Sequence, residues 1–269
     1  MNSTTTAAAT RFHSLHRNRH HPLVLANAWD AASARLIEAA GAPAIATTSA
    51  GVAWSLGYPD GNALPLHEAL GAVTRIAAAV SVPVTVDIEG GYADDPDGVE
   101  RTVDAVLGAG AVGINIEDGV LPPSELVDRI TAARRAAERA GVRLFVNART
   151  DVHLAGLVAP DRMLAESIDR ANRYVDAGAD GVFVPGVGDV DTIRALVEAV
   201  GAPLNVMAGP GSPIVSELAA LGVARVSLGS GVAQAAYAVA RQAATELLTA
   251  GTYDSTARGV EYGEMNALF

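Results

Sequence analysis

The stretch PVTVDIEGGYADDPDGVERTVDAVLGAGAVGINIE, residues 83–117, contains the unit from which the fold can be predicted. Residues 83–88 and 113–117 are segments of strand length in which Val or Ile alternates with other residues, and residues 98–109 between them carry a helical pattern. Strands joined through a helix pair in parallel by a right-handed crossover. The chain as a whole is rich in Ala and other aliphatic residues, which suits helices packed on both faces of a parallel sheet, so the unit predicts an α/β protein.

The same alternation continues in both directions and predicts eight strands and eight helices. The expected strands span residues 23–27, 44–48, 83–88, 113–117, 144–149, 181–184, 204–207 and 225–228. The expected helices span residues 31–40, 66–80, 98–109, 124–140, 161–177, 190–200, 213–221 and 231–250. Seven of these helices are followed by a glycine that suits a left-handed C-cap, namely Gly41, Gly110, Gly141, Gly178, Gly201, Gly222 and Gly251. Eight such units favour a closed (β/α)8 TIM barrel, with an open doubly wound sheet as the alternative.

The length of the chain fits one domain of this type. A (β/α)8 barrel takes about 250 residues, and the chain has 269. We expect a catalytic barrel over residues 22–269, including a C-terminal tail, and an N-terminal extension over residues 1–21. This extension contains His13, His16, His20 and His21, and we expect a mobile or helical segment there rather than a metal site.

The charge and composition of the chain disfavour several classes of binding partner. The net charge of −11 disfavours nucleic acids and anionic membranes, whose binding depends on Lys and Arg patches. No apolar run reaches the roughly 18 residues of a membrane span. The chain has no cysteine, which excludes disulfides, thiolate metal sites and a cysteine nucleophile. We therefore expect a cytoplasmic protein that binds a small molecule.

Carboxylates gather where the third and fourth expected strands end. Asp87 and Glu89 stand two positions apart and would share one face of an extended strand, as would Asn115 and Glu117 on the next strand. Barrel active sites lie at these C-terminal strand ends. Converging carboxylates repel one another unless some are protonated or a cation neutralises them. Oxygen ligands favour Mg²⁺ or Mn²⁺ over Zn²⁺, so we predict a divalent metal site at Asp87, Glu89 and Glu117.

Helix capping or pairing with Arg is the alternative for these acids, and it is our expectation for four other residues, Asp94, Asp95, Asp97 and Asp118. Arg149 ends the fifth expected strand, opposite the acidic group. A planar guanidinium suits a carboxylate or phosphate, so we predict that Arg149 binds an anionic substrate. A salt bridge to Glu117 or Asp151 is the alternative, and both roles are compatible.

Five segments, in this order and on these strands, resemble the isocitrate lyase/phosphoenolpyruvate mutase superfamily over residues 23 to about 250. The segments are SAG (49–51), SLGYPD (55–60), VDIEGGY (86–92), IED (116–118) and NARTD (147–151). The resemblance implies a loop around Thr48, Ser49, Ala50 and Gly51 whose backbone amides bind the substrate carboxylate, with Asn205 as a further substrate contact. It also implies a mobile gating loop that carries Tyr58 and Asp60 as catalytic candidates.

For the chemistry, the resemblance implies that Asp87, Glu89 and Glu117 hold Mg²⁺ or Mn²⁺ and that Arg149 binds the substrate. The family usually has Asp at the position of Glu89. Its members act on 2-oxo, 2-hydroxy or enolpyruvyl acids and break or form a C–C or P–C bond next to an enolate. Many exchange the last helix between subunits, which here would be residues 231–250 of a homodimer or homotetramer.

The chain departs from its relatives in the loop GVLPPS, residues 119–124. Isocitrate and methylisocitrate lyases carry Cys there, and the mutase carries Lys and Asn, so these activities are disfavoured. What remains is metal-assisted C–C cleavage of a small 2-oxo or 2-hydroxy dicarboxylate, by retro-aldol reaction or decarboxylation. Tyr58, Asp60, Tyr92 and Ser124 are candidate proton donors. The alternatives are P–C chemistry on a phosphonopyruvate-like substrate and a non-catalytic binding barrel.

Overall fold

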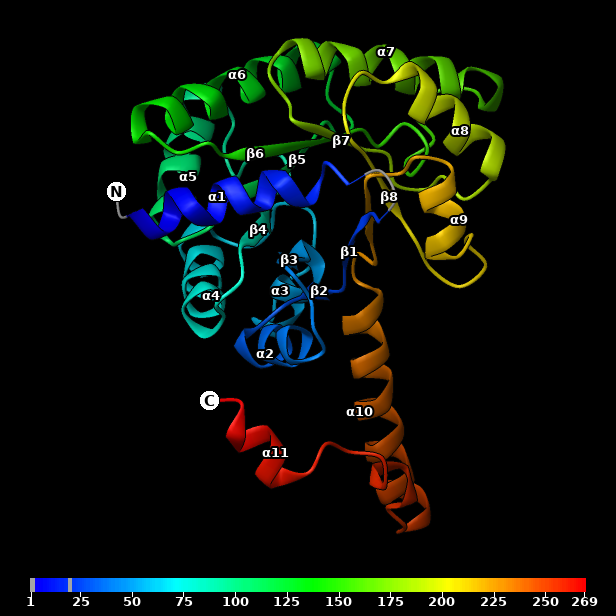
Figure 1. Cartoon of the computed structure of the whole chain (residues 1–269). Coiled ribbons are helices and arrows are strands. Elements are labelled where there is room, and N and C mark those ends of the chain that lie inside the picture. Colours follow the sequence, from blue (N-terminus) through cyan, green and yellow to red (C-terminus); the bar gives the residue numbers. More distant parts are fainter. Residues whose placement is uncertain (1–2, 19–20) are drawn as a thin grey trace.

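A nearly closed barrel of parallel strands forms the centre of the molecule (Figure 1). The structure, a computed structural model, describes residues 3–18 and 21–269. Within that part of the chain the strand order is β1-β9-β8-β7-β6-β5-β4-β3-β2, and every pairing is parallel. The strand segments are β1 (Leu23–Leu25), β2 (Asn27–Ala28), β3 (Ile45–Thr47), β4 (Val84–Asp87), β5 (Gly113–Glu117), β6 (Phe145–Arg149), β7 (Gly181–Phe183), β8 (Leu204–Met207) and β9 (Arg225–Ser227).

The first strand is split, where the sequence predicted one strand over residues 23–27. β1 pairs with β9, whereas β2 pairs with β3, so the two halves of this strand join the two edges of the sheet. The Asn27 side chain spans the same junction: its Nδ2 donates to the carbonyl oxygen of Thr47, and its Oδ1 accepts from the backbone N of Leu228. The break therefore replaces one straight strand by a bend that brings the barrel close to closure.

Helices alternate with the strands and cover the outside of the barrel (Figure 1). Their ends agree with the sequence prediction to within one or two residues. Glycines follow as expected, except that Gly201 does not adopt the left-handed conformation of the other six. The helices of the barrel are α2 (Ala31–Ala39), α4 (Leu66–Ala79), α5 (Pro96–Gly108), α6 (Pro123–Ala140), α7 (Met163–Asp176) with the preceding 3-10 turn Pro160–Arg162, α8 (Val190–Ala199), α9 (Val215–Ala220) and α10 (Gly231–Ala250).

One further helix lies in the stretch that was expected to be a loop, residues 49–65. α3 (Ser49–Ser55) begins directly after β3, with Thr48 as its N-cap. Its Val52 and Ala53 are buried against Leu64 of the following loop. The sequence prediction missed α3 because the helix is short and contains Gly51, which lowers helix propensity, whereas its stability comes from this packing.

The N-terminal helix α1 (Ser3–Leu15) covers the end of the barrel where the strands begin. Phe12 is fully buried and packs edge-to-face on Phe145, the first residue of β6, with ring centroids 5.5 Å apart. The His16 ring stacks on the same Phe145 at 3.9 Å, and His13 Nε2 lies 3.1 Å from the carbonyl oxygen of Arg143. His13 and His16 are thus buried by packing at this end of the barrel, and His20 lies outside the described residues.

The C-terminal part of the chain leaves the barrel. α10 extends away from the strands, and Ala233 is its one buried residue (Figure 1). After the 3-10 turn Asp254–Thr256, α11 (Tyr262–Ala267) returns toward α2, where Arg35 Nε donates to the carbonyl oxygen of Leu268 at 2.5 Å. Among the described residues, no helix has the length and apolarity needed to cross a membrane.

Candidate active site

The carboxyl ends of β4, β5 and β6 bring Asp87, Glu117 and Arg149 together. In the sheet register Asp87 stands beside Asn115, and Glu117 stands beside Arg149. Arg149 Nη1 and Glu117 Oε2 are 2.6 Å apart. Parallel strands end on the same side, so the sequence prediction that these groups share one barrel mouth is realised for this trio of side chains.

Asp87 is held only lightly. Its Oδ1 accepts from the backbone N of Glu89 at 3.2 Å, and its Oδ2 accepts from the backbone N of Ser49 at 3.4 Å. The backbone N of Asp87 donates to Thr47 Oγ1 at 2.9 Å, which fixes the end of β4. With these two long hydrogen bonds, the Asp87 carboxylate retains lone pairs for a further ligand.

Glu89 lies differently from the strand geometry expected for it. β4 ends at Asp87, and Glu89 has a left-handed backbone with φ of 51°. Its Oε2 accepts from the backbone N of Asn62, in the loop after α3, while its Oε1 is buried without a hydrogen-bond partner among the described residues. Burial raises the pKa of Glu89. The hydrogen bond from Asn62 lowers this pKa in part, and the nearby charges of Asp87 and Asp60 raise it further.

The three carboxylates therefore do not form the convergent triad that the sequence suggested. Among residues 3–18 and 21–269, no three His, Cys, Asp or Glu side chains are gathered so that they could hold a metal ion as they stand. Glu89 turns toward Asn62, and Glu117 pairs with Arg149. The metal site at Asp87, Glu89 and Glu117 stays a prediction.

The charges of the site nevertheless fit a cation. The pKa of Glu117 is raised to about 8, mainly by burial. The charge of Arg149 lowers this pKa in part, and repulsion from Asp87 raises it further. One guanidinium thus serves several neighbouring carboxylates, and no hydrogen bond from the described part of the chain reaches the buried Glu89 Oε1. A divalent ion bound by Asp87 and Glu117, with water completing its shell, suits these oxygen donors, since Mg²⁺ commonly keeps several waters.

Arg149 is fixed from two sides. Besides its contact with Glu117, its Nε and Nη2 donate to Asp151 Oδ1 and Oδ2 at 2.6 and 3.0 Å. This forked pairing sets the plane of the guanidinium. The salt bridges offered as an alternative to substrate binding are both present, and they leave the Arg149 side chain 18% exposed at the mouth of the barrel.

The predicted carboxylate-binding segment forms the first turn of α3. Ser49, Ala50 and Gly51 are buried there, and Thr48 Oγ1 accepts weakly from the backbone N of Gly51 at 3.5 Å. A Cβ at position 51 would come within 2.8 Å of both Thr48 Cγ2 and Trp29 Cβ. Close packing is therefore sufficient reason for glycine at this position, and substrate binding by these amides stays a prediction.

The loop after α3 reaches the acidic residues through Asp60 and Asn62. Asp60 is exposed, yet it lies near enough to raise the pKa of Glu89. Tyr58 packs against the small apolar cluster around Val52, and a catalytic role for it stays a prediction. Tyr92 is the tyrosine of the site: burial, followed by the charge of Glu89, raises its pKa, so the phenol keeps its proton at neutral pH.

Asn205 lies inside the barrel. It is 1% exposed, its Oδ1 accepts from Asn147 Nδ2 at 3.1 Å, and its Nδ2 donates to Ser227 Oγ at 3.1 Å. Its amide is therefore committed to the interior rather than to an open pocket. Arg225, which the sequence analysis missed, crosses the same layer and donates from Nη2 to Asn115 Oδ1 at 3.3 Å.

A pocket of about 670 Å³ opens beside these groups. Glu117 and Tyr92 line it together with apolar side chains such as Leu64 and Leu121. Arg129 of α6 also lines it and donates from Nη1 to the carbonyl oxygen of Gly90. The sequence could have indicated Arg129, because its spacing places it on the apolar face of α6. The buried neighbours on that face are Leu126, Ile130 and Ala133.

Comparisons with known proteins show the family to which the chain belongs. Residues 12–248 match the family model for phosphoenolpyruvate phosphomutase. An uncharacterised protein of Mycobacterium tuberculosis is 41% identical over 261 residues, covering 95% of each chain. The 2-methylisocitrate lyase of Salmonella typhimurium is 31% identical over 204 residues, covering 69% of this chain and 65% of its own. The crystal structure of a lyase/mutase candidate from Burkholderia cenocepacia, 37% identical, superposes with a TM-score of 0.90 over 99% of this chain and 96% of its own.

Proposed function

The chain belongs to the phosphoenolpyruvate phosphomutase family, and from this premise we propose that it is a Mg²⁺- or Mn²⁺-dependent lyase. Its substrate would be a small 2-oxo or 2-hydroxy dicarboxylate, cleaved at a C–C bond through an enolate. The observation that carries the proposal is Arg149 at the barrel mouth, facing Asp87 and Glu117 beside a pocket of about 670 Å³.

We assign a different role in the proposed reaction to each side chain of the site. Arg149 would bind one carboxylate of the substrate through Nη1, the group that Asp151 leaves free and that Glu117 would release when it turns to the cation. Asp87 and Glu117 would hold the cation, which supplies stabilisation of negative charge as the C–C bond breaks. Tyr92 lines the pocket, has a raised pKa that keeps its phenol protonated, and would protonate the enolate carbon.

The apolar part of the pocket would exclude water from the reacting carbon. Leu64 and Leu121 face the space next to Tyr92 and Glu117. A low-dielectric wall strengthens the attraction of Arg149 for a bound anion and of Glu117 for a bound cation. The absence of cysteine separates this chain from a cysteine-dependent mechanism, so cleavage would rely on charge stabilisation and a tyrosine proton donor.

A substrate panel tests the proposal. Purified protein with Mg²⁺ is incubated with 2-oxo and 2-hydroxy dicarboxylates, including oxaloacetate, and release of pyruvate or glyoxylate is measured. In the same assay Asp87→Ala should lower turnover at least about 100-fold, because it removes a proposed cation ligand. Asp95→Ala is the matched control, since Asp95 caps α5 through the backbone N of Gly98 outside the pocket. Full activity of Asp87→Ala in the presence of a chelator would contradict the proposed metal site.

P–C chemistry is the second candidate, and the family model favours it by its own description. A phosphonate would need cationic partners in addition to Arg149, and Arg129 is the buried arginine that lines the same pocket. Phosphonopyruvate followed by phosphorus NMR separates the two reactions. An unchanged spectrum, together with C–C cleavage in the dicarboxylate panel, would eliminate this candidate.

A further inference from the structure

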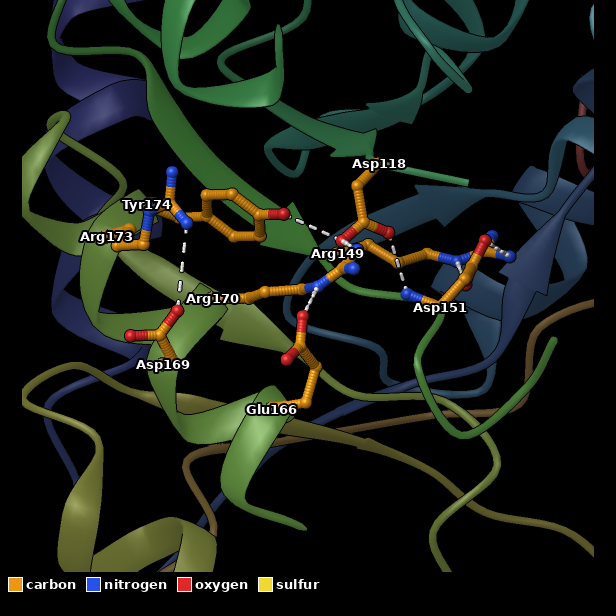
Figure 2. Close-up of polar contacts among 8 residues, drawn as sticks. All are labelled: Asp118, Arg149, Asp151, Glu166, Asp169, Arg170, Arg173 and Tyr174. Carbon is orange, nitrogen blue, oxygen red and sulfur yellow. Dashed lines mark hydrogen bonds and ion pairs between the residues drawn. The ribbon is translucent and has the colours of Figure 1, made fainter. Parts of the chain in front are cut away.

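We infer that Asp118, held by Arg170 and Tyr174 of α7, is a positioning residue that sets the orientation of Arg149. Figure 2 shows the group, which runs from α7 through Asp118 to Asp151 and Arg149. The inference rests on the proposed function, in which Arg149 binds the substrate carboxylate. It assigns a role to a residue for which the sequence predicted only capping or ion pairing.

Asp118 holds the end of β6 on both sides of Thr150. Its backbone N donates to the carbonyl oxygen of Arg149 at 3.2 Å, and its Oδ1 accepts from the backbone N of Asp151 at 2.8 Å. Thr150 itself donates from its backbone N to the carbonyl oxygen of Phe183 at 2.9 Å. The backbone of the three residues from Arg149 to Asp151 is thus hydrogen-bonded to Asp118, which follows β5, and to β7.

Asp151 transmits this position to the guanidinium. Its two carboxylate oxygens accept from Nε and Nη2 of Arg149 at 2.6 and 3.0 Å. Because both bonds lie in the plane of the guanidinium, any tilt of Asp151 tilts Arg149 with it. Asp118 acts on the backbone of Asp151, so it controls the direction of a side chain that it does not contact.

α7 supplies the other half of the arrangement. Arg170 Nη1 and Tyr174 Oη both donate to Asp118 Oδ2, at 3.0 and 2.7 Å. Arg170 and Tyr174 are four residues apart and therefore share one face of the helix. Glu166, four residues before Arg170, accepts from Arg170 Nε at 2.8 Å and fixes the rotamer of the arginine.

Burial separates this positioning role from direct catalysis. The Asp118 side chain has 0% exposed surface, and Tyr174 is likewise fully buried, so neither side chain can touch a substrate. A carboxylate in such a place requires its hydrogen bonds, because an unpaired buried charge is strongly unfavourable. Loss of one donor should therefore move Asp118, and through it Asp151 and Arg149.

The test measures binding of oxalate, an enolpyruvate mimic, in the presence of Mg²⁺ by calorimetry, alongside the thermal unfolding midpoint. Tyr174→Phe keeps the ring and removes one hydrogen bond, and Asp118→Asn removes the charge at constant shape. By analogy with outer-shell partners of metal ligands, we expect oxalate to bind about 10-fold more weakly or worse in Asp118→Asn, with a smaller loss in Tyr174→Phe. Tyr174→Phe serves as the conservative variant if Asp118→Asn does not fold.

Arg134→Met is the matched control for stability. Arg134 Nε and Nη1 donate to the carbonyl oxygens of Gly178 and Leu144, both at 2.6 Å, at the opposite end of the strands. This variant should lower the unfolding midpoint while oxalate binds as in the wild type. If Asp118 only stabilised the fold, Tyr174→Phe and Asp118→Asn would also lower the unfolding midpoint and bind oxalate as the wild type does. That result would overturn the inference.

Arg149→Gln distinguishes the inference from the function on which it rests. If Arg149→Gln binds oxalate as well as the wild type does, the proposed function and the inference both fail. If Arg149→Gln loses oxalate while Tyr174→Phe and Asp118→Asn retain wild-type affinity, the inference alone fails. Weaker oxalate binding in Arg149→Gln, Tyr174→Phe and Asp118→Asn, with wild-type oxalate binding in Arg134→Met, supports both the proposed function and the inference.

Discussion

The Glu89 carboxylate connects the loop after α3 to the mouth of the barrel. It accepts a hydrogen bond from the backbone N of Asn62, and both residues have left-handed backbone conformations, with φ of 51° and 61°. Non-glycine residues rarely adopt such angles without support from the surrounding structure. The contact therefore holds the loop over the acidic residues, and its loss should release the loop.

Removal of this acceptor should be visible in hydrogen exchange. In Glu89→Ala we expect the amide of Asn62 to exchange about 10-fold faster, which corresponds to the loss of one hydrogen bond of about 1.4 kcal/mol. Asn62→Gly is the control, because glycine keeps the backbone donor and tolerates the positive φ. Equal exchange rates in the wild type and Glu89→Ala would show that the carboxylate does not hold the loop.

At the scale of one element, α1 links barrel stability to pH through His16. The His16 ring is stacked on Phe145, its Nδ1 lies 2.9 Å from the carbonyl oxygen of Phe12, and its Nε2 has no partner among the described residues. Burial, followed by repulsion from Arg225, lowers the pKa of His16 from 6.5 to about 3. The native state therefore keeps this ring neutral where the unfolded chain protonates it.

The sign of the effect follows from proton uptake on unfolding. Between pH 6.5 and about 3 the unfolded chain binds the extra proton, so the contribution of His16 to stability is complete above pH 6.5 and decreases as the pH falls through that range. The slope is up to about 1.4 kcal/mol per pH unit. Chemical denaturation at a series of pH values measures it as the difference between the wild type and His16→Gln.

His67→Gln provides the control for that series, because the His67 side chain is 81% exposed on α4. Its stability profile should coincide with that of the wild type. If His16→Gln and the wild type lost stability in parallel from pH 6.5 to 4, His16 would not be the group that takes up the proton.

At the scale of the whole molecule, α10 predicts self-association. Leu248 is 83% exposed and Leu247 is 57% exposed on a helix that packs little against its own barrel. Exposed apolar surface of this kind marks interaction sites, and a second copy of the chain would cover it. We expect a homodimer or homotetramer, to be measured by light scattering coupled to size-exclusion chromatography.

The double variant Leu247→Glu/Leu248→Glu should shift the protein to a monomer at micromolar concentration, because it places two charges in the apolar surface. Thr249→Glu adds a charge to the neighbouring exposed position and should leave the assembly intact. A wild type that is already monomeric at these concentrations would contradict the proposed helix exchange.

The agreement between sequence and structure differs among the elements. Helices such as α6 and α10 were placed almost to the residue, because their apolar spacing and the glycine that follows them are local signals. α3 was missed, since a seven-residue helix with a glycine at its third position depends on tertiary packing. The division of the first strand into β1 and β2 was missed as well. It depends on pairing with β9 on one side and β3 on the other, which the local sequence does not indicate.

The sequence by itself determined a parallel α/β fold, favoured a closed barrel over an open doubly wound sheet, and predicted that Asp87, Glu117 and Arg149 lie at the same end of the strands. Strand alternation is a local property, and parallel strands end on one side wherever they lie in the sheet. Only the tertiary structure decided that Glu89 turns toward Asn62 and that α7 supports Arg149 through Asp118. The first depends on a single left-handed φ, and the second on hydrogen bonds between residues more than 50 positions apart, which no periodicity in the sequence encodes.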